Sequence, residues 1–151
     1  MGKSYLKKFK IRSDQSRLYF WVYIYSNVEE LRKAGNQHSK DTGAEDNFDE
    51  CHGLCHTYDR FKIKEDGSEE LVDDIGIIRL SVTHLGTIYV SHELIHAALH
   101  LYRRAASMIV NRKIDANFGS GCGSREETFA YMYGELFADM NHKLHDHKFW
   151  K

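Results

Sequence analysis

Two histidines and a glutamate in the segment His92-Glu93-Leu94-Ile95-His96 have the types and the spacing of a zinc site. Residues four apart on a helix project from one face, separated by about one turn, or 5.4 Å of rise. The imidazoles of His92 and His96 can therefore bind a single Zn²⁺, each at roughly 2.0–2.1 Å. Glu93, between them, can hold and deprotonate a metal-bound water. The pattern predicts metal-assisted hydrolysis, the chemistry of zinc metallopeptidases.

The sequence around this motif favours a helix. The run from Ile88 to Leu101 is apolar, with good helix formers in its second half. Histidines and a glutamate in so apolar a segment are costly to bury unless something binds them. The alternative is a buried core helix with two hydrogen-bonded histidines, because short motifs also arise by chance. His100 is expected to pack beside the site, since three histidines at successive turns span about 11 Å, too long for one zinc.

A second apolar helix is expected after Ser124, and its sequence offers several third ligands. Glu127 is one candidate, although it also fits a capping box with Ser124 as the N-cap, a role that needs no metal. Glu126 is adjacent but points about 100° away around the helix. Glu135 begins a Glu-x-x-Ala-Asp sequence that lies further from His96 along the chain.

Residues 75 to 140 resemble the small gluzincin-type proteins that many phages encode, and more distantly the ImmA/IrrE-type metallopeptidases. The match is HExxH followed about thirty residues later by the sequence Glu-Thr-Phe-Ala-Tyr, from Glu127 to Tyr131. The resemblance implies that Glu127 is the third zinc ligand and that the small Ala130 lets the two helices pack closely. ImmA/IrrE-type proteins have Asn or Asp at the position of Tyr131, so a regulatory protease role is not implied. The implied substrate is a protein or peptide.

Length and composition predict one small domain over residues 1–151. The net charge is −1, no apolar run approaches transmembrane length, and no signal peptide is recognisable at the N-terminus. Three cysteines in such a chain predict free thiols in a reducing compartment. We therefore expect action in the cytoplasm, that of the host for a phage-encoded protein, without a membrane partner. The sequence leaves the oligomeric state open.

Basic residues crowd the first 17 positions, which we expect to form an arm. A basic arm can contact nucleic acid, but such runs are more often solvated faces. No helix suited to reading a groove accompanies this one, so nucleic-acid binding is not expected.

Two further clusters have metal-binding residue types. The segment from Cys51 to His56 (Cys-His-Gly-Leu-Cys-His) leaves a second, structural zinc open, although Cys51 and Cys55 have no matching cysteine pair downstream. Residues 142–151 form a His-rich tail, expected to be mobile and to bind metal adventitiously.

The predicted order of elements is β-α-β-β-α-α, an α+β class with a minimal zincin-like fold: a small sheet packed on two site helices. Strands are expected over 18–25, 55–63 and 75–82, and a short helix over 28–34, with Ser26 as its N-cap and Gly35 at its end. The site region spans residues 75–140. In proteins of this resemblance a sheet edge beside the motif helix pairs with extended substrate.

The predicted function is zinc-dependent peptide-bond hydrolysis, with His92, His96 and Glu127 as metal ligands and Glu93 as the base. The alternative is a zinc-bound, non-catalytic protein that binds or inhibits a host or phage protein, because function depends on the site and its access. A metal-free domain with an accidental HExxH is a third hypothesis.

Overall fold

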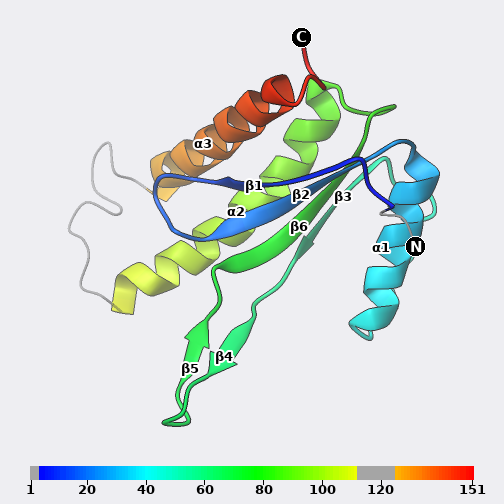
Figure 1. Ribbon diagram of the computed structural model, residues 1–151. Coiled ribbons are helices and arrows are strands. Elements are labelled where there is room, and N and C mark those ends of the chain that lie inside the picture. The colour runs from blue at the N-terminus through cyan, green and yellow to red at the C-terminus, as the bar shows by residue number, and fades with distance from the viewer. Residues whose placement is uncertain (1–3, 112–124) are drawn as a thin grey trace.

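The computed structural model describes residues 4–111 and 125–151 (Figure 1). Its elements are β1 (Lys7–Arg12), β2 (Tyr19–Tyr25), α1 (Val28–Asp41), β3 (Gly53–Thr57), β4 (Phe61–Ile63), β5 (Glu69–Leu71), β6 (Asp74–Ser81), α2 (Thr87–Asn111) and α3 (Arg125–Asp146). The α+β class predicted from the sequence is confirmed.

The main sheet has the strand order β1-β2-β6-β3. Its central strands β2 and β6 are parallel, whereas β1 pairs antiparallel with β2, and β3 pairs antiparallel with β6. Strands β1 and β3 are therefore the edges of this sheet. Strands β4 and β5 form a separate antiparallel hairpin that projects away from it (Figure 1).

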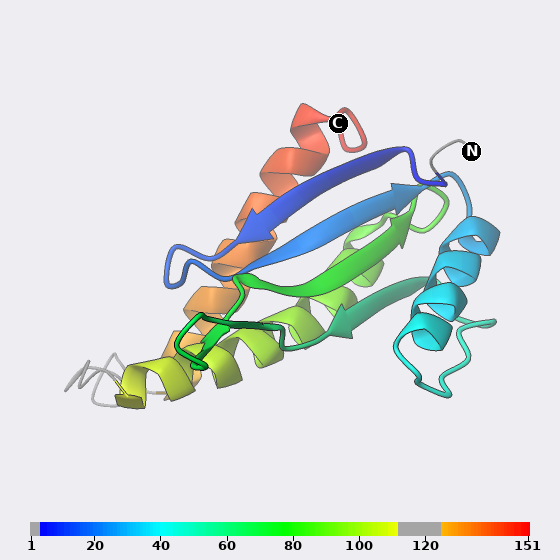
Figure 2. The ribbon, with the colours of Figure 1, turned by 60° about the horizontal axis from the view of Figure 1, so that its bottom comes forward.

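Alternation along β2 shows how the sheet separates two layers. Phe20, Val22 and Ile24 are fully buried in the main core, whereas Trp21 and Tyr23 are half-buried. Successive side chains of a strand point to opposite faces of the sheet. Helices α2 and α3 cover the first face and α1 lies against the second (Figure 2).

Helices α2 and α3 lie side by side and run antiparallel (Figure 1). The rings of Tyr102 and Phe129 are 6.2 Å apart, between the later part of α2 and the start of α3. At the other end, Trp150 Nε1 donates to the Leu85 carbonyl oxygen at 2.8 Å. The His-rich residues that were expected to form a separate tail are therefore continuous with the folded chain. Residues 142–146 belong to α3, and Trp150 packs on the core.

The N-terminal basic arm is also corrected, because residues 7–12 form β1. Phe9 and Ile11 are buried in the core, whereas Lys8 and Lys10 point away and lie over the Trp21 ring. The alternation of lysine with apolar residues is that of a half-buried strand. The many lysines of this segment favoured the prediction of a basic arm over that of a strand with alternating polar and apolar residues.

Helix α1 extends seven residues beyond its predicted end at 34, to Asp41. Its N-cap is Asn27, one residue later than expected, whose Oδ1 accepts from the Glu30 amide at 2.9 Å. Gly35 does not end the helix but lies buried within it. A Cβ there would approach Leu54 Cδ2 to 2.6 Å, so glycine allows α1 to pack closely on β3. The single strand predicted over 55–63 is divided between β3 and β4.

Gly76 in β6 provides a test of this packing. A Cβ at Gly76 would lie 2.7 Å from the His56 carbonyl oxygen and 2.7 Å from Phe20 Cδ1. Gly76→Ala should therefore destabilise the protein by about 1–3 kcal/mol, through overpacking. Gly134→Ala, in α3 with open space around it, should stabilise by about 0.5–1 kcal/mol through helix propensity. Urea unfolding curves measure both changes, and shifts of the same sign would contradict the packing account.

Candidate metal centre

The HExxH motif lies in the first half of α2, on the face turned away from the core. His92 and His96 are exposed, and their ring centroids are 5.1 Å apart. Leu94, Ala97 and Leu101 are fully buried on the other side of the helix. Within the described ranges neither imidazole has a hydrogen-bond partner. The helix is thus not a buried core helix with hydrogen-bonded histidines, and the two neighbouring imidazoles are free to serve as two of the ligands that a metal ion needs.

Glu93 is buried between α2 and the edge strand β3, with 6% of its surface exposed. A Cβ added to Gly53 would lie 3.1 Å from Glu93 Oε1, so the carboxyl group lies directly against the strand. Burial raises the pKa of Glu93 to about 7. A carboxyl group in this state can accept and release a proton near neutral pH.

A groove of about 430 Å³ runs between β3 and α2, with the motif on its helical side. Strand β3 contributes Gly53, Leu54, Cys55 and Thr57, and α2 contributes His92, Glu93, His96, Leu99, His100 and Arg103. The outer edge of β3 has no neighbouring strand within the part of the chain that the structure describes. Gly53 was missed in the sequence, although a glycine within a strand often marks a close approach of another group.

His100 occupies the far end of this groove and has a packing role, as expected. Its Nε2 lies 3.1 Å from the Tyr58 carbonyl oxygen and 3.4 Å from Asp59 Oδ1. Asp59 also pairs with Arg104, one turn further along α2. These contacts fasten the segment between β3 and β4 to the helix, and they hold the groove wall in place.

Glu127, the predicted third ligand, is not brought together with the two histidines. No group of three or more His, Cys, Asp or Glu side chains among the described residues could hold a metal ion. The Tyr102–Phe129 contact explains why, since it places the exposed Glu127 alongside α2 beyond Tyr102. Tyr102 itself is six residues, about 9 Å of helix, beyond His96. Coordination by Glu127 would require the first turn of α3 to approach the motif. Ser124, its predicted capping partner, lies outside the described residues.

The other candidate, Glu135, has a structural role. It accepts hydrogen bonds from the Ser13 hydroxyl at 2.6 Å and the Asp14 amide at 2.8 Å. Asp139, one turn on, accepts from the Arg12 amide at 2.9 Å. The Glu-x-x-Ala-Asp sequence therefore attaches α3 to the connection between β1 and β2, away from the motif.

The cluster from Cys51 to His56 is divided between the two faces of the sheet. Cys55 lines the groove, whereas the neighbouring His56 stacks on His38 of α1, with ring centroids 4.2 Å apart. Both Cys51 and Cys55 are free thiols. Because adjacent strand residues point in opposite directions, these donors do not converge on one metal ion.

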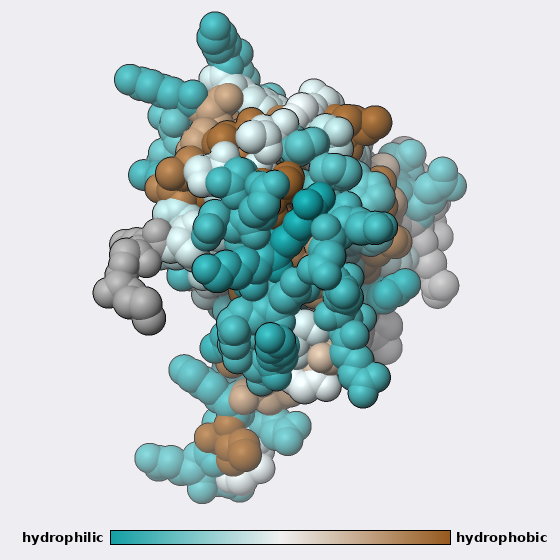
Figure 3. Space-filling model, turned by 90° about the vertical axis from the view of Figure 1, so that its right-hand side faces the viewer, coloured by the Kyte–Doolittle hydropathy of each residue, from teal (hydrophilic) through white to brown (hydrophobic). Residues whose placement is uncertain are grey.

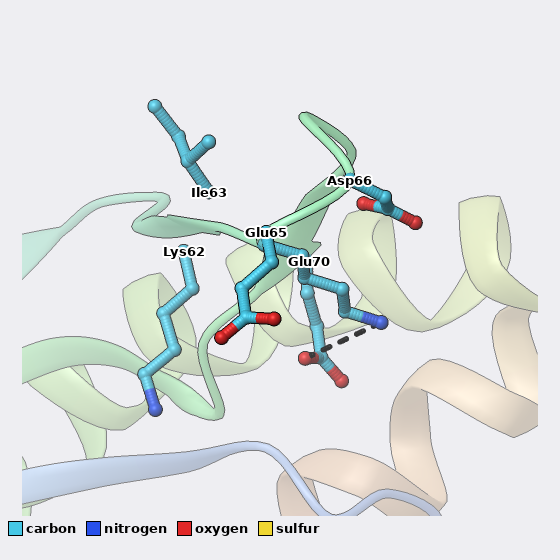
Figure 4. Close-up of a pocket in the computed structure, with 6 residues that line it drawn as sticks. Lys62, Ile63, Glu65, Asp66 and Glu70 are labelled. Carbon is cyan, nitrogen blue, oxygen red and sulfur yellow. Dashed lines mark ion pairs between the residues drawn. The ribbon is translucent and has the colours of Figure 1, made fainter.

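The β4–β5 hairpin carries another hollow. Hydrophobic residues gather on this projecting hairpin, at the bottom of Figure 3, and Ile63 is 78% exposed. In Figure 4 Ile63 points away from the charged side chains that line the hollow, and a 3.7 Å ion pair joins Lys64 to Glu70. Exposed pairs of this kind contribute little free energy, and the hollow holds no grouping suited to catalysis.

Comparison with known proteins adds no identity to these observations. No family model, no curated protein and no solved structure matches the chain. Among the described residues, no helix combines the length and the apolar character needed to cross a membrane. Function must therefore be inferred from the chemistry of the site.

The buried Glu93 carboxyl predicts a pH dependence for the metal-free protein. Its pKa is about 7 in the folded chain and 4.5 as the ordinary value, so the unfolded chain loses its proton first as pH rises. The contribution of Glu93 to the free energy of unfolding therefore falls between pH 4.5 and 7 and does not change above this window. Glu93→Gln removes this loss, and in chelator-treated protein it should exceed wild-type stability at pH 8 by up to about 3 kcal/mol. Urea unfolding at pH 4 and pH 8 tests this, since an equal difference at both values would indicate a packing effect instead.

Proposed function

We propose that the protein is a zinc-dependent peptidase that cleaves peptide bonds in the groove between β3 and α2. The observation that carries the proposal is the exposed pair His92 and His96 beside the buried Glu93, at a groove bordered by an edge strand. Two imidazoles on one helical face and an adjacent carboxylate are the residue types that such hydrolysis requires.

The residues of the groove have distinct roles in this proposal. His92 and His96 would hold Zn²⁺, and Glu127, the predicted third ligand, would complete the site if the first turn of α3 approaches the motif. The bound metal would polarise the scissile carbonyl and acidify a water. Glu93 takes the proton of the attacking water on its carboxylate and later returns it to the leaving amine. An extended peptide would pair with the edge of β3. Ile95 and Leu99, exposed beside the histidines, would contact its apolar side chains.

A second candidate is a binding protein without catalytic activity. It is favoured by the separation of Glu127 from the two histidines, because a zinc site without its third protein ligand binds metal weakly. In that case the groove would hold a segment of a host or phage protein without cleaving it. For either function the cytoplasm is the proposed site of action, because Cys51 and Cys55, the two cysteines that the structure describes, are free thiols.

Zinc content tests the metal site on which the peptidase proposal depends. Protein purified without metal-affinity steps should contain one tightly held zinc per chain by elemental analysis, and His96→Ala should lose it. Glu127→Ala should also abolish tight binding, whereas Glu126→Ala, the matched control, should keep it. Loss of zinc in Glu126→Ala and its retention in Glu127→Ala would instead identify Glu126 as the third ligand. Zinc unchanged by His96→Ala would place the metal outside the motif and favour the binding protein.

Cleavage tests the role of Glu93. Glu93→Gln should keep zinc and lose peptide hydrolysis by at least about a hundredfold, because the amide cannot accept the proton of the water. The assay is mass spectrometry of a peptide mixture incubated with each protein, with Glu126→Gln as the control variant. Undiminished cleavage by a zinc-loaded Glu93→Gln protein would refute the mechanism.

A further inference from the structure

A second cavity of about 400 Å³ lies between α1 and the sheet, on the face opposite to the HExxH helix. Its walls include three tyrosines from the start of the chain and from β2, namely Tyr5, Tyr23 and Tyr25. Arg79 of the central strand β6 forms part of its lining, and Lys33 of α1 lies at the same cavity. Cavities of this size are typical of small-molecule sites.

Arg79 is the unusual residue of this cavity, because it is 93% buried without a carboxylate partner in the described chain. One guanidinium nitrogen donates to the Tyr25 hydroxyl at 2.5 Å, whereas Nε is buried and has no hydrogen-bond partner. The guanidinium carbon lies 5.3 Å from the centre of the Tyr23 ring. A neutral hydroxyl and an aromatic face do not neutralise a buried cation, and a guanidinium group does not escape by losing its proton.

The neighbouring ionisable groups do not supply the missing counter-charge. Burial, and after it the charge of Arg79, lower the pKa of His38. Burial, then His38 and Arg79, lower the pKa of His56 to about 3. An imidazole is neutral or positively charged, so neither histidine can balance the guanidinium. Glu30 and Asp41 also line the cavity, but neither is paired with Arg79, and Asp41 accepts a hydrogen bond from Gln37 of α1.

We propose that this cavity is a binding site for a small organic oxyanion, a phosphate monoester or carboxylate on an aromatic group, with Arg79 as its anchor. The planar guanidinium fork matches two oxygens of either anion. Tyr5 and Tyr23, whose rings meet edge to face at 4.9 Å, provide an aromatic wall for the ring of the ligand. Lys33 adds a second positive charge at the cavity.

This site is independent of the proposed peptidase groove. Arg79 pairs in register with Leu54 of β3, whose neighbours Gly53 and Cys55 face the groove on the other side of the sheet. A ligand bound here would contact α1, β2 and β6 and leave the HExxH face open. Removal of zinc, or the substitution His96→Ala, should therefore leave anion binding unchanged.

The test is thermal unfolding in increasing phenyl phosphate, benzoate or inorganic phosphate at constant ionic strength. Each bound anion should raise the unfolding midpoint with its concentration, and the two aromatic anions should bind more tightly than inorganic phosphate. Arg79→Met should weaken binding about ten- to a hundredfold, the loss of one or two charge-assisted hydrogen bonds. Without ligand it should raise the midpoint, because it removes an unpaired buried charge.

Two further variants keep the test decisive. Arg17→Met, at an exposed arginine paired with Asp73, is the matched control and should bind as wild type does. Lys33→Gln, on the exposed side of α1, should weaken binding several-fold and tests the site even if Arg79→Met does not fold. The proposal is overturned if none of the three anions raises the wild-type midpoint. It is also overturned if Arg79→Met and Lys33→Gln respond to the anions as Arg17→Met does. Stronger stabilisation by phenyl phosphate identifies a phosphate monoester as the ligand class, and stronger stabilisation by benzoate identifies a carboxylate.

Discussion

Helix α2 must bury one apolar face on the sheet, and the rest of the candidate metal centre depends on this packing. Leu94, Ala97 and Leu101 are fully buried in the main core. Because side chains on a helix repeat every 3.6 residues, burial of this face turns His92 and His96 outward. The same orientation directs Glu93 sideways, against β3. One amphipathic pattern thus exposes the two imidazoles of the HExxH motif and desolvates the carboxyl group between them.

The edge strand β3 contributes side chains to both faces of the sheet. Along β3, Gly53 and Cys55 border the groove, while Leu54 and His56 point toward α1. Because Gly53 has no side chain, the Glu93 carboxyl group can lie against β3 at this position. On the opposite face of the sheet, Leu54 packs on α1 at Gly35. A slip of one residue in this edge strand would exchange the two sets and remove both environments.

Two buried ionisable groups, one on each face of the main sheet, reduce the stability of the fold, and each lies beside a cavity. Desolvation raises the pKa of Glu93 to about 7, and Arg79 is buried without an acidic partner among the described residues. Apolar residues of similar volume would fit either position at a lower cost in free energy. Burial of an ionisable group without a partner lowers the free energy of unfolding. Such groups are expected beside a cavity where a ligand or a reacting atom supplies the missing partner.

Local pattern determined much of this protein. The β-rich run of β2, the apolar run of β6 and the helix that carries HExxH were predicted from residue type and apolar runs, and the α+β class followed from their order. Strand β1 was missed because its lysines alternate with the buried Phe9 and Ile11, and the charge was weighed above the period. The end of helix α1 was wrongly predicted at Gly35. This glycine lies inside the helix, where it allows close packing on β3.

Only the tertiary structure decided which distant groups meet. The position of Glu127 depends on the register of α3 against α2, which ring contacts and the docking of Trp150 determine, and no local pattern encodes it. The structural role of Glu135 arises from a turn more than a hundred residues away. In the sequence, Arg79 is one cation within an apolar strand, and this feature alone could have indicated a buried charge. Its burial, with no counter-charge in the described parts of the chain, follows from the pairing of strands and the docking of α1, which are long-range contacts that residue spacing does not specify.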